Sequence, residues 1–363
     1  MNPAAPAEAE TALDAVLAAI AAGAAERDRD PTGAFPFAAI EALTAAGAMQ
    51  ATASPNPIPF TEELALLRTV AAADTGVARI LDGHLNAVER LHVQAPPAVR
   101  DPELAAIAAG ARVAGVWGAD PAPGEGEPAR VVDGALHGTK TFCSGAGGLD
   151  RAIVLARTAD PDAPPAAAWV DLTAIGTVDV DREWFCGAGM RSSASHRVTF
   201  IGTPVLAILG PPGALTAQPW FARDAIRTAA TWAGAADAAV EDAITHLAAR
   251  PHTGDLEALA AGRLRTWQQT IDLWLRAAGE DLGAGSIDGG PRRAADVAAR
   301  ARTALADAAR AILDEAERAT GSRPAAAGSV LDRAARDLRL FMLQHRLEPI
   351  LARSGRAEID ERR

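Results

Sequence analysis

Apolar residues recur at helical spacing through the first third of the chain. Between Ala7 and Arg112 the sequence is rich in alanine and leucine, and apolar residues fall on every third or fourth position. The clearest set is Leu13, Val16, Leu17 and Ile20. Proline-containing breaks at 30–31 and 55–57 divide the pattern. We therefore expect an N-terminal helical domain, residues 1–112, with four or five helices.

The pattern changes at Val113 to short runs that are typical of β-strands. These runs cover residues 113–117, 130–132, 152–155, 168–170 and 197–200. Turn-forming sequences lie between them, among them Asp133-Gly134, and dipeptides of this type favour β-hairpins. The spacing predicts a small, mostly antiparallel β-domain over residues 113–209.

Long helical patterns return after Pro219. We expect helices near 219–249, 255–283, 291–320 and 329–352. A glycine-rich segment at 285–291 marks a clear break between two of them. Residues 210–363 are therefore expected to form a C-terminal four-helix bundle, and the whole chain belongs to the α+β class.

Composition and charge narrow the possible functions. The chain has 363 residues with 49% hydrophobic and 22% charged residues, which is ordinary for a globular protein. Its net charge of -11 leaves no basic stripe to neutralise nucleic-acid phosphates. The N-terminus lacks a basic segment, and no apolar run reaches the roughly 18 residues that a membrane span needs. We expect a cytoplasmic protein that binds neither nucleic acid nor a membrane.

The two cysteines, Cys143 and Cys186, give no sign of a disulfide framework or a metal site. They lie far apart, and neither has a second cysteine or a histidine at ligand spacing. We expect both to be small hydrophobic residues of the core.

The segment Asp133–Ala146 combines a hairpin signal with the run Lys140-Thr141-Phe142-Cys143-Ser144. It resembles a hairpin of the acyl-CoA dehydrogenase family, in which an aromatic-x-Ser/Thr strand passes beside the isoalloxazine ring of a flavin. The resemblance implies that Phe142, Cys143 and Ser144 bind the cofactor through backbone and hydroxyl groups at the polar edge of that ring. An Asp-Gly hairpin with an aromatic core anchor explains the same residues without a flavin.

A second segment, Gly189–Phe200, places Gly189, Arg191, Ser195 and Phe200 at offsets similar to those of the same family. In the family this segment lines the flavin and substrate cavity. The resemblance implies that Arg191 and Ser195 contact the cofactor. A surface turn with a solvated Arg191 is the alternative.

The segment 331–346 resembles the last long helix of the family, where an Arg-Asp pair precedes the catalytic loop by about two turns. The pair here is Arg336-Asp337, which suits a purely structural ion pair equally well. Dehydrogenases of the family place the glutamate of a Glu-Gly-Thr sequence at the position of His345, and no Gly-Thr follows here.

Histidine at this position is typical of a branch of the fold that resembles dibenzothiophene monooxygenase. Those enzymes take reduced FMN from a separate reductase and oxygenate a small substrate. A second histidine, from the N-terminal helical domain, faces their cavity, and His84 is the matching residue. Histidine suits proton transfer because its ordinary pKa is about 6.5. A hydrogen-bonded interior histidine is the alternative for His84.

Three functional hypotheses remain open. The resemblance favours a flavin-dependent oxidoreductase that acts on a small organic molecule with help from His345 and His84, forms a homo-oligomer (dimer or tetramer), and has a flavin reductase as partner. A true acyl-CoA dehydrogenase is the second, with Asp224 or another carboxylate as base, although the position of Asp224 favours a residue in the first turn of a helix. The third is a flavin-free interaction protein. The segment Arg250–Glu257 lacks the aromatic residue that accompanies FAD in the family, which favours FMN over FAD.

Overall fold

The chain divides into two compact units, each assembled from separate stretches of the sequence. The computed structural model describes residues 6–54, 56–158, 160, 162–284, 290–344 and 346–363. The first unit comprises the chain up to residue 58, residues 76–186 and residues 191–220. The second comprises residues 59–75, 187–190 and 221–363. The division into 1–112, 113–209 and 210–363 stays a prediction.

The first unit joins helices of the N-terminal third to all the strands. Its helices are α1 (Pro6–Arg29), α2 (Phe37–Ala45), α4 (Thr75–Gln94) and α5 (Pro97–Ala108). Its strands are β1 (Ala114–Trp117), β2 (Arg130–Val132), β3 (Ala135–Cys143), β4 (Arg151–Ala156), β5 (Ala166–Asp171), β6 (Val178–Asp181) and β7 (His196–Ile208). Two short 3-10 helices, Arg191–Ser193 and Ala214–Thr216, complete it.

The strands form a mixed sheet that is mostly antiparallel, as the sequence predicts. Its order is β1-β4-β5-β7-β3-β2, with β6 paired to β7. Only β1 and β4 are described as a parallel pair, and the other pairs of named strands are antiparallel. The long strand β7 pairs with β3, β5 and β6, so it joins the two halves of the sheet.

The core of the first unit lies between α4, α5 and the β1, β4 and β5 side of the sheet. Val88 and Leu91 of α4 and Ile107 of α5 pack with Ile153 and Trp169 of the strands, and all five are almost completely buried. Burial of each large apolar side chain stabilises a fold by roughly 1.5–3 kcal/mol. This packing holds α4 against strands β1, β4 and β5.

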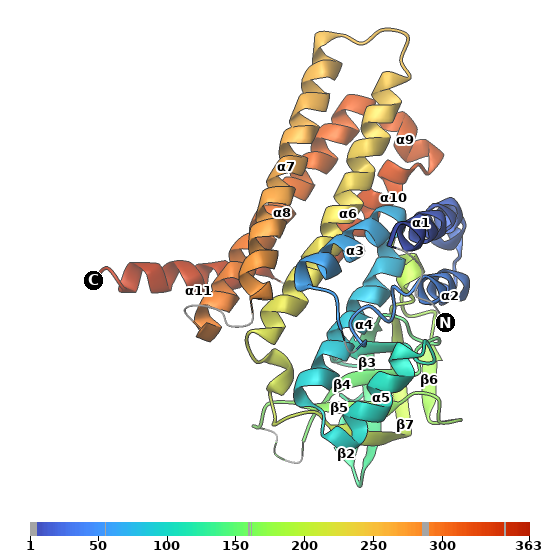
Figure 1. Ribbon diagram of the computed structural model, residues 1–363, viewed down its shortest axis with the longest axis vertical. Helices are drawn as coiled ribbons and strands as arrows, with labels where there is room; N and C mark the ends of the chain where they lie inside the picture. Colours follow the sequence, from blue (N-terminus) through green and yellow to red (C-terminus); the bar gives the residue numbers. More distant parts are fainter. Residues whose placement is uncertain (1–5, 55, 159, 161, 285–289, 345) are drawn as a thin grey trace. The chain divides into compact units, whose positions relative to one another are not determined.

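The second unit is helical. It contains α3 (Phe60–Ala73), α6 (Trp220–Ala248), α7 (Asp255–Gly283), α8 (Gly290–Thr320), α9 (Ser322–Ala327), α10 (Val330–Phe341) and α11 (Leu347–Asp360). Three of the predicted long helices are confirmed as α6, α7 and α8, and α7 packs along α8 (Figure 1). The prediction of one helix near 329–352 is wrong, because α10 ends at Phe341 and a separate helix begins at Leu347. None of the helices, within the described ranges, has the length and hydropathy to cross a membrane.

A glycine allows α3 and α6 to pack closely within the second unit. A Cβ atom on Gly234 of α6 would lie 2.0 Å from the carbonyl oxygen of Arg68 in α3. The Arg68 guanidinium also binds Asp237 of α6, at 2.5 Å from Nε to Oδ2. The close backbone approach and the ion pair therefore fix the same two helices.

Candidate functional site

Three serine hydroxyls form a continuous hydrogen-bonded chain in the first unit. Ser144 Oγ lies 2.8 Å from Ser195 Oγ, and Ser195 Oγ lies 2.7 Å from Ser193 Oγ. Ser193 and Ser195 are buried, whereas Ser144 is partly exposed. We call these residues the serine chain. Ser144 and Ser195 were predicted from the sequence and are brought together here; Ser193 was not.

Backbone hydrogen bonds hold the two segments that carry the serine chain. The N–H of Gly145 donates to the carbonyl of Ser193 at 2.8 Å, and the N–H of Ala146 donates to the carbonyl of Ala194 at 3.1 Å. These bonds hold the segment just after β3 beside the segment just before β7. These main-chain bonds thus hold the segments that carry the three hydroxyl oxygens.

Two residues beside the serine chain have left-handed backbone conformations. Phe142 has φ 51° and Ala194 has φ 46°. For a residue with a Cβ atom this conformation costs about 1–2 kcal/mol. Met190, just before the predicted Arg191, is also left-handed, with φ 59°. Non-glycine residues in such conformations concentrate at functional sites, where the surrounding structure supports the strain.

Trp117, at the end of β1, fixes the backbone at Ser144. Its indole Nε1 donates to the carbonyl oxygen of Ser144 at 2.9 Å, and the side chain is almost fully buried. This bond joins the first strand of the sheet to the turn that follows β3.

The loop after β1 is attached to β3 by Lys140 and Thr141. Lys140 Nζ donates to the carbonyl of Gly118 at 3.1 Å and to Asp120 Oδ1 at 2.7 Å. The N–H of Thr141 donates to the carbonyl of Ala119 at 3.1 Å. Burial lowers the pKa of Lys140, while its bond to Asp120 favours the charged form. The loop at 118–120 is therefore held at a fixed place beside the strand that carries Phe142.

Phe142 belongs to a small aromatic cluster at the surface of the first unit. Its side chain is 54% exposed. It meets Trp184 edge-on, with ring centroids 4.9 Å apart, and Phe185 at 6.2 Å. Trp184 Nε1 donates to Glu125 Oε1 at 3.0 Å, which connects the cluster to the loop before β2. An exposed aromatic ring two residues before a partly exposed hydroxyl suits a flat polar ligand.

The two cysteines differ in environment. Cys143 is fully buried and lies opposite His196 in the β3–β7 register. Burial raises the pKa of its thiol well above the ordinary value, so the group stays protonated. Cys186 is exposed, and the prediction that it belongs to the core is wrong. It lies in the turn-rich segment after β6, where neighbouring strands cannot cover it.

Arg191 opens the short 3-10 helix Arg191–Ser193, which leads directly into the serine chain. Its carbonyl accepts a hydrogen bond from the N–H of Ala194 at 3.3 Å. The side chain is partly exposed. Its predicted contact with a cofactor stays a prediction.

His84 is fully buried in α4, and backbone groups bind both of its ring nitrogens. Nε2 lies 2.8 Å from the carbonyl oxygen of Met49, and Nδ1 accepts the N–H of Ala114 at 3.0 Å. Burial lowers the pKa of His84 from 6.5 to about 4. The ring is therefore neutral, with its proton on Nε2. This geometry favours the interior role that the sequence left open, and a catalytic role stays a prediction.

Asp224 lies in the second unit, on α6, beside a buried cation. Its Oδ1 is 3.5 Å from Nη1 of Arg227, whose side chain is 1% exposed. Arg227 also binds Glu63 of α3, with its Nη2 2.7 Å from Oε2. Asp224 is thus part of an ion-pair group between two helices, and its role as a catalytic base stays a prediction.

The Arg336-Asp337 pair of α10 binds the segment 187–190. The Asp337 carboxylate accepts a hydrogen bond from the N–H of Met190, and the Arg336 guanidinium donates to the carbonyl of Ala188. A Cβ atom on Gly189 would lie 2.4 Å from the carbonyl oxygen of Arg336. The pair therefore has a structural role, which connects the two predicted family segments. His345, the other predicted catalytic residue of this region, lies outside the described residues.

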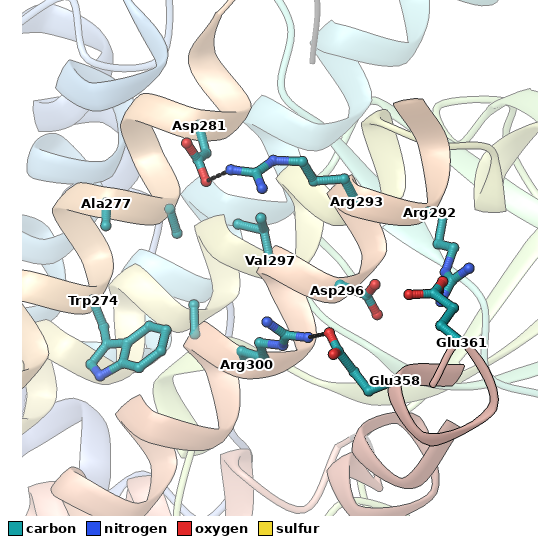
Figure 2. A pocket seen from close by; sticks show the side chains of 12 residues that line it. Trp274, Ala277, Asp281, Arg292, Arg293, Asp296, Val297, Arg300, Glu358 and Glu361 are labelled. Atoms are coloured by element: carbon teal, nitrogen blue, oxygen red, sulfur yellow. Dashed lines mark hydrogen bonds and ion pairs between the residues drawn. The ribbon is translucent and has the colours of Figure 1, made fainter. Parts of the chain in front are cut away.

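A surface groove of about 480 Å³ lies between α7, α8 and α11 in the second unit (Figure 2). Ion pairs cross it: Arg293–Asp281 at 3.1 Å, Arg300–Glu358 at 2.8 Å and Arg292–Glu361 at 2.7 Å. None of the predicted site residues that the structure describes lines this groove. Over the described part of the chain, no group of three His, Cys, Asp or Glu residues is placed to hold a metal ion.

Solved structures resemble this chain over nearly its whole length. KijD3, in complex with FMN and dTDP-3-amino-2,3,6-trideoxy-4-keto-3-methyl-D-glucose, is 23% identical with a TM-score of 0.84, over 98% of this chain and 95% of its own. TdsC from Paenibacillus sp. A11-2, with FMN and indole, is 20% identical with a TM-score of 0.84, covering 98% and 97%.

A nitrososynthase from Micromonospora carbonacea var. africana is 26% identical, with a TM-score of 0.82 and 98% of each chain covered. No protein-family model matches the sequence. The comparison with curated proteins likewise found no match. The chain therefore has the fold of the acyl-CoA dehydrogenase-type flavoenzymes, which include the dibenzothiophene monooxygenases.

Proposed function

We propose that this protein is a flavin-dependent oxidoreductase that binds FMN at the surface formed by Phe142 and Ser144, and that it oxygenates or oxidises a small organic molecule. Proteins with FMN bound share its fold at a TM-score of 0.84. The observation that carries the proposal is local. Phe142, which has a left-handed backbone and an exposed ring, lies two residues before Ser144. The Ser144 hydroxyl is hydrogen-bonded to Ser195, and the Ser144 carbonyl accepts from Trp117.

The residues present fit a flavin chemically. A flavin is a flat ring system with an apolar part and a polar edge that both donates and accepts hydrogen bonds. The exposed ring of Phe142 provides an apolar contact, and Ser144 provides a hydroxyl that donates or accepts. The site thus offers both kinds of contact within one turn of chain.

The bound flavin would supply the electron transfer, and the protein would supply binding and orientation. Ser144 would hold the polar edge of the ring, and the Phe142 ring would contact its apolar part. Lys140 would keep the 118–120 loop in place beside them. Left-handed Phe142 and Ala194 would keep these groups in position before the ligand arrives.

FMN, delivered in reduced form by a separate flavin reductase, is the form of cofactor that we propose. In the segment that corresponds to the FAD-binding segment of the family, Arg250 binds Glu257 at 2.9 Å and donates to the carbonyl of Ala319 at 2.8 Å. It therefore already has two partners within the helical unit. Proton transfer by His345 belongs to the same proposal and rests on the sequence resemblance alone. The dehydrogenase alternative is less favoured, because Asp224 lies against Arg227.

We further propose that the chain forms a homo-oligomer through α7. Leu256, Leu259, Trp267 and Trp274 fall on one face of this helix by their spacing, and all four are exposed. Trp267 is 39% exposed and Trp274 is 40% exposed. Aromatic residues are enriched at interfaces between subunits. A second copy would cover this stripe with an identical one.

Flavin binding is the first test of the proposed function. Equilibrium dialysis of the purified chain against FMN or FAD, oxidised or reduced under anaerobic conditions, gives the affinity for each form. We expect saturable binding of FMN, tighter than that of FAD. Oxygen uptake that requires both a flavin reductase and this protein, measured over a panel of small organic molecules, then identifies the reaction. Absence of binding for both flavins in both oxidation states would overturn the proposal.

A further inference from the structure

The serine chain can point in either of two directions. In each of its two hydrogen bonds, either oxygen can be the donor. When Ser193 donates to Ser195 and Ser195 donates to Ser144, the Ser144 proton is available to a ligand. When the direction reverses, Ser144 donates inward and presents a lone pair to the ligand. The two arrangements differ only by rotation of three hydroxyl groups, and each hydroxyl keeps its own proton.

A flavin requires both arrangements at the same atom. At the polar edge of the ring, a nitrogen accepts hydrogen bonds in the oxidised form and carries a proton, and so donates, in the reduced form. A single hydroxyl that faces this edge must therefore change from donor to acceptor when the flavin is reduced. Its own proton then needs another acceptor, because an unpaired buried donor costs about 1–3 kcal/mol.

We propose that Ser195 and Ser193 are positioning residues that supply this acceptor, so that Ser144 can bind both oxidation states of FMN. The inference rests on the proposed function for the presence of FMN, and it goes beyond it by assigning Ser195 a role through Ser144 instead of direct contact. Ser195 accepts the Ser144 proton in the reduced state, and Ser193 accepts that of Ser195.

The local structure indicates that the contact between the three serine hydroxyls is not a chance contact. Left-handed Ala194 lies between Ser193 and Ser195 and shapes the turn in which their hydroxyls meet. The carbonyls of Ser193 and Ala194 are held by the main chain of Gly145 and Ala146, so the spacing of the three oxygens is fixed by the backbone. Ser193 and Ser195 are buried, which limits replacement of a missing hydroxyl by water.

The serine chain predicts the direction in which each substitution shifts the midpoint potential of bound FMN. Ser195→Ala removes the acceptor for the Ser144 proton, which the reduced state needs. In the oxidised state the Ser144 hydroxyl still donates to the ring. It loses only the hydrogen bond that its oxygen accepted from Ser195. Reduced FMN should therefore bind about fivefold more weakly relative to oxidised FMN, which lowers the midpoint potential of the bound flavin by about 20 mV for a two-electron couple. Ser193→Ala should shift the potential in the same direction by a smaller amount.

The experiment measures the midpoint potential of bound FMN and the affinity for oxidised and reduced FMN in wild type, Ser195→Ala, Ser195→Thr, Ser144→Ala and the Ser144→Ala/Ser195→Ala double variant. Circular dichroism confirms that each variant is folded. We expect Ser195→Thr, which keeps a hydroxyl, to stay closer to wild type than Ser195→Ala. Because Ser195 acts through Ser144, we expect the double variant to match Ser144→Ala.

Two results would overturn the assignment while FMN still binds. One is a Ser195→Ala protein with the wild-type potential. The other is a Ser195→Ala shift that persists in full when Ser144 is already alanine, because that would show a direct or purely structural effect. Failure of the wild-type chain to bind FMN in either state is a separate outcome, which would remove the proposed function and this inference together.

Discussion

The carboxylate of Asp337 in α10 accepts a hydrogen bond from the backbone N–H of Met190, 147 residues earlier in the chain. Met190 holds a left-handed conformation and is followed at once by Arg191 and the serine chain. A single buried carboxylate thus anchors the strained residue that directly precedes Arg191 in the chain. Residues far apart in sequence, each part of a different family resemblance, form one structural connection.

Removal of this carboxylate should destabilise the second unit. Asp337→Ala leaves the buried N–H of Met190 without its acceptor, and we expect a loss of about 2 kcal/mol in the free energy of unfolding. Asp337→Asn keeps an oxygen that accepts and should lose about half as much. Urea denaturation measures both values. Asp314→Ala is the control, because Asp314 is 79% exposed and lies 3.9 Å from Arg339, so its removal should change stability by less than about 0.5 kcal/mol. Equal effects in Asp337→Ala and the control would contradict the role of the bond.

Two glycines in α4 should respond in opposite ways to alanine. A Cβ atom on Gly76 would lie 2.2 Å from Ser192 Oγ and 2.5 Å from the backbone nitrogen of Ser193. Gly76→Ala should therefore cost about 2–3 kcal/mol of stability and weaken FMN binding, because it displaces the segment that carries Ser193. At Gly83 the nearest atom would be 3.9 Å away. Gly83→Ala should be neutral or stabilise the protein by up to about 1 kcal/mol through helix propensity. Denaturation of both variants, with FMN titration, tests the pair.

The buried His84 should make the protein less stable in mild acid. Its pKa is lowered from 6.5 to about 4. As the pH falls below 6.5, His84 therefore becomes protonated in the unfolded chain and stays neutral in the folded chain. The stabilisation is fully present above pH 6.5 and is lost as the pH falls toward 4. Between pH 7 and pH 5 this residue should account for a loss of about 2 kcal/mol. Burial also lowers the pKa of His196, which adds to the fall in wild type.

His84→Gln separates the contribution of His84 from that of His196. Glutamine still offers a donor and an acceptor but does not titrate, so the variant should lose less stability between pH 7 and pH 5 than wild type. Chemical denaturation at both pH values gives the difference, and an unchanged loss would contradict it. Turnover at pH 7 decides the functional question. A folded His84→Gln protein with near wild-type turnover has a structural histidine, whereas loss of turnover in the folded variant would support the catalytic prediction.

The exposed stripe on α7 predicts the oligomeric state. Size-exclusion chromatography with light scattering should give a dimer or tetramer for wild type, and Trp267→Glu should shift it to smaller species because a charge would be buried at the interface. Ile175→Glu is a matched control, since Ile175 is 99% exposed and stands alone in a turn of the other unit. A monomeric wild type, or a Trp267→Glu protein of unchanged mass, would contradict the proposal.

The pattern of apolar and polar residues predicted most helices and strands of the fold. The elements that it missed have local causes. The predicted helix at 219–249 is α6, Trp220–Ala248. The split between α10 and α11 was missed, although Pro349 carried the signal. Proline is tolerated in the first turn of a helix and not in its interior, so Pro349 marks the beginning of α11. Strand β6 was also missed, because valine alternates with aspartate in Val178–Asp181, and aspartate is uncommon in strands.

The candidate site was only partly predictable. Phe142, Ser144 and Ser195 follow from the resemblance, and the structure places the two serines in contact. Ser193 was missed because its contact with Ser195 depends on the left-handed conformation of Ala194, and alanine has no preference for that conformation that a sequence could reveal. The bonds of His84 were equally hidden, since Met49 and Ala114 contribute backbone atoms and leave no side-chain pattern.

The hydrogen bond from Trp117 to Ser144 also gives the protein an internal optical probe. The sequence contains seven tryptophans and no tyrosine, so its near-ultraviolet emission comes almost entirely from indole rings. Trp117 bonds to the serine whose hydroxyl faces the proposed ligand, and Trp184 touches the exposed ring of Phe142. A flavin absorbs in the range where tryptophan emits. Occupancy of the site should therefore quench the emission of these two residues by energy transfer, so that binding can be followed without a label.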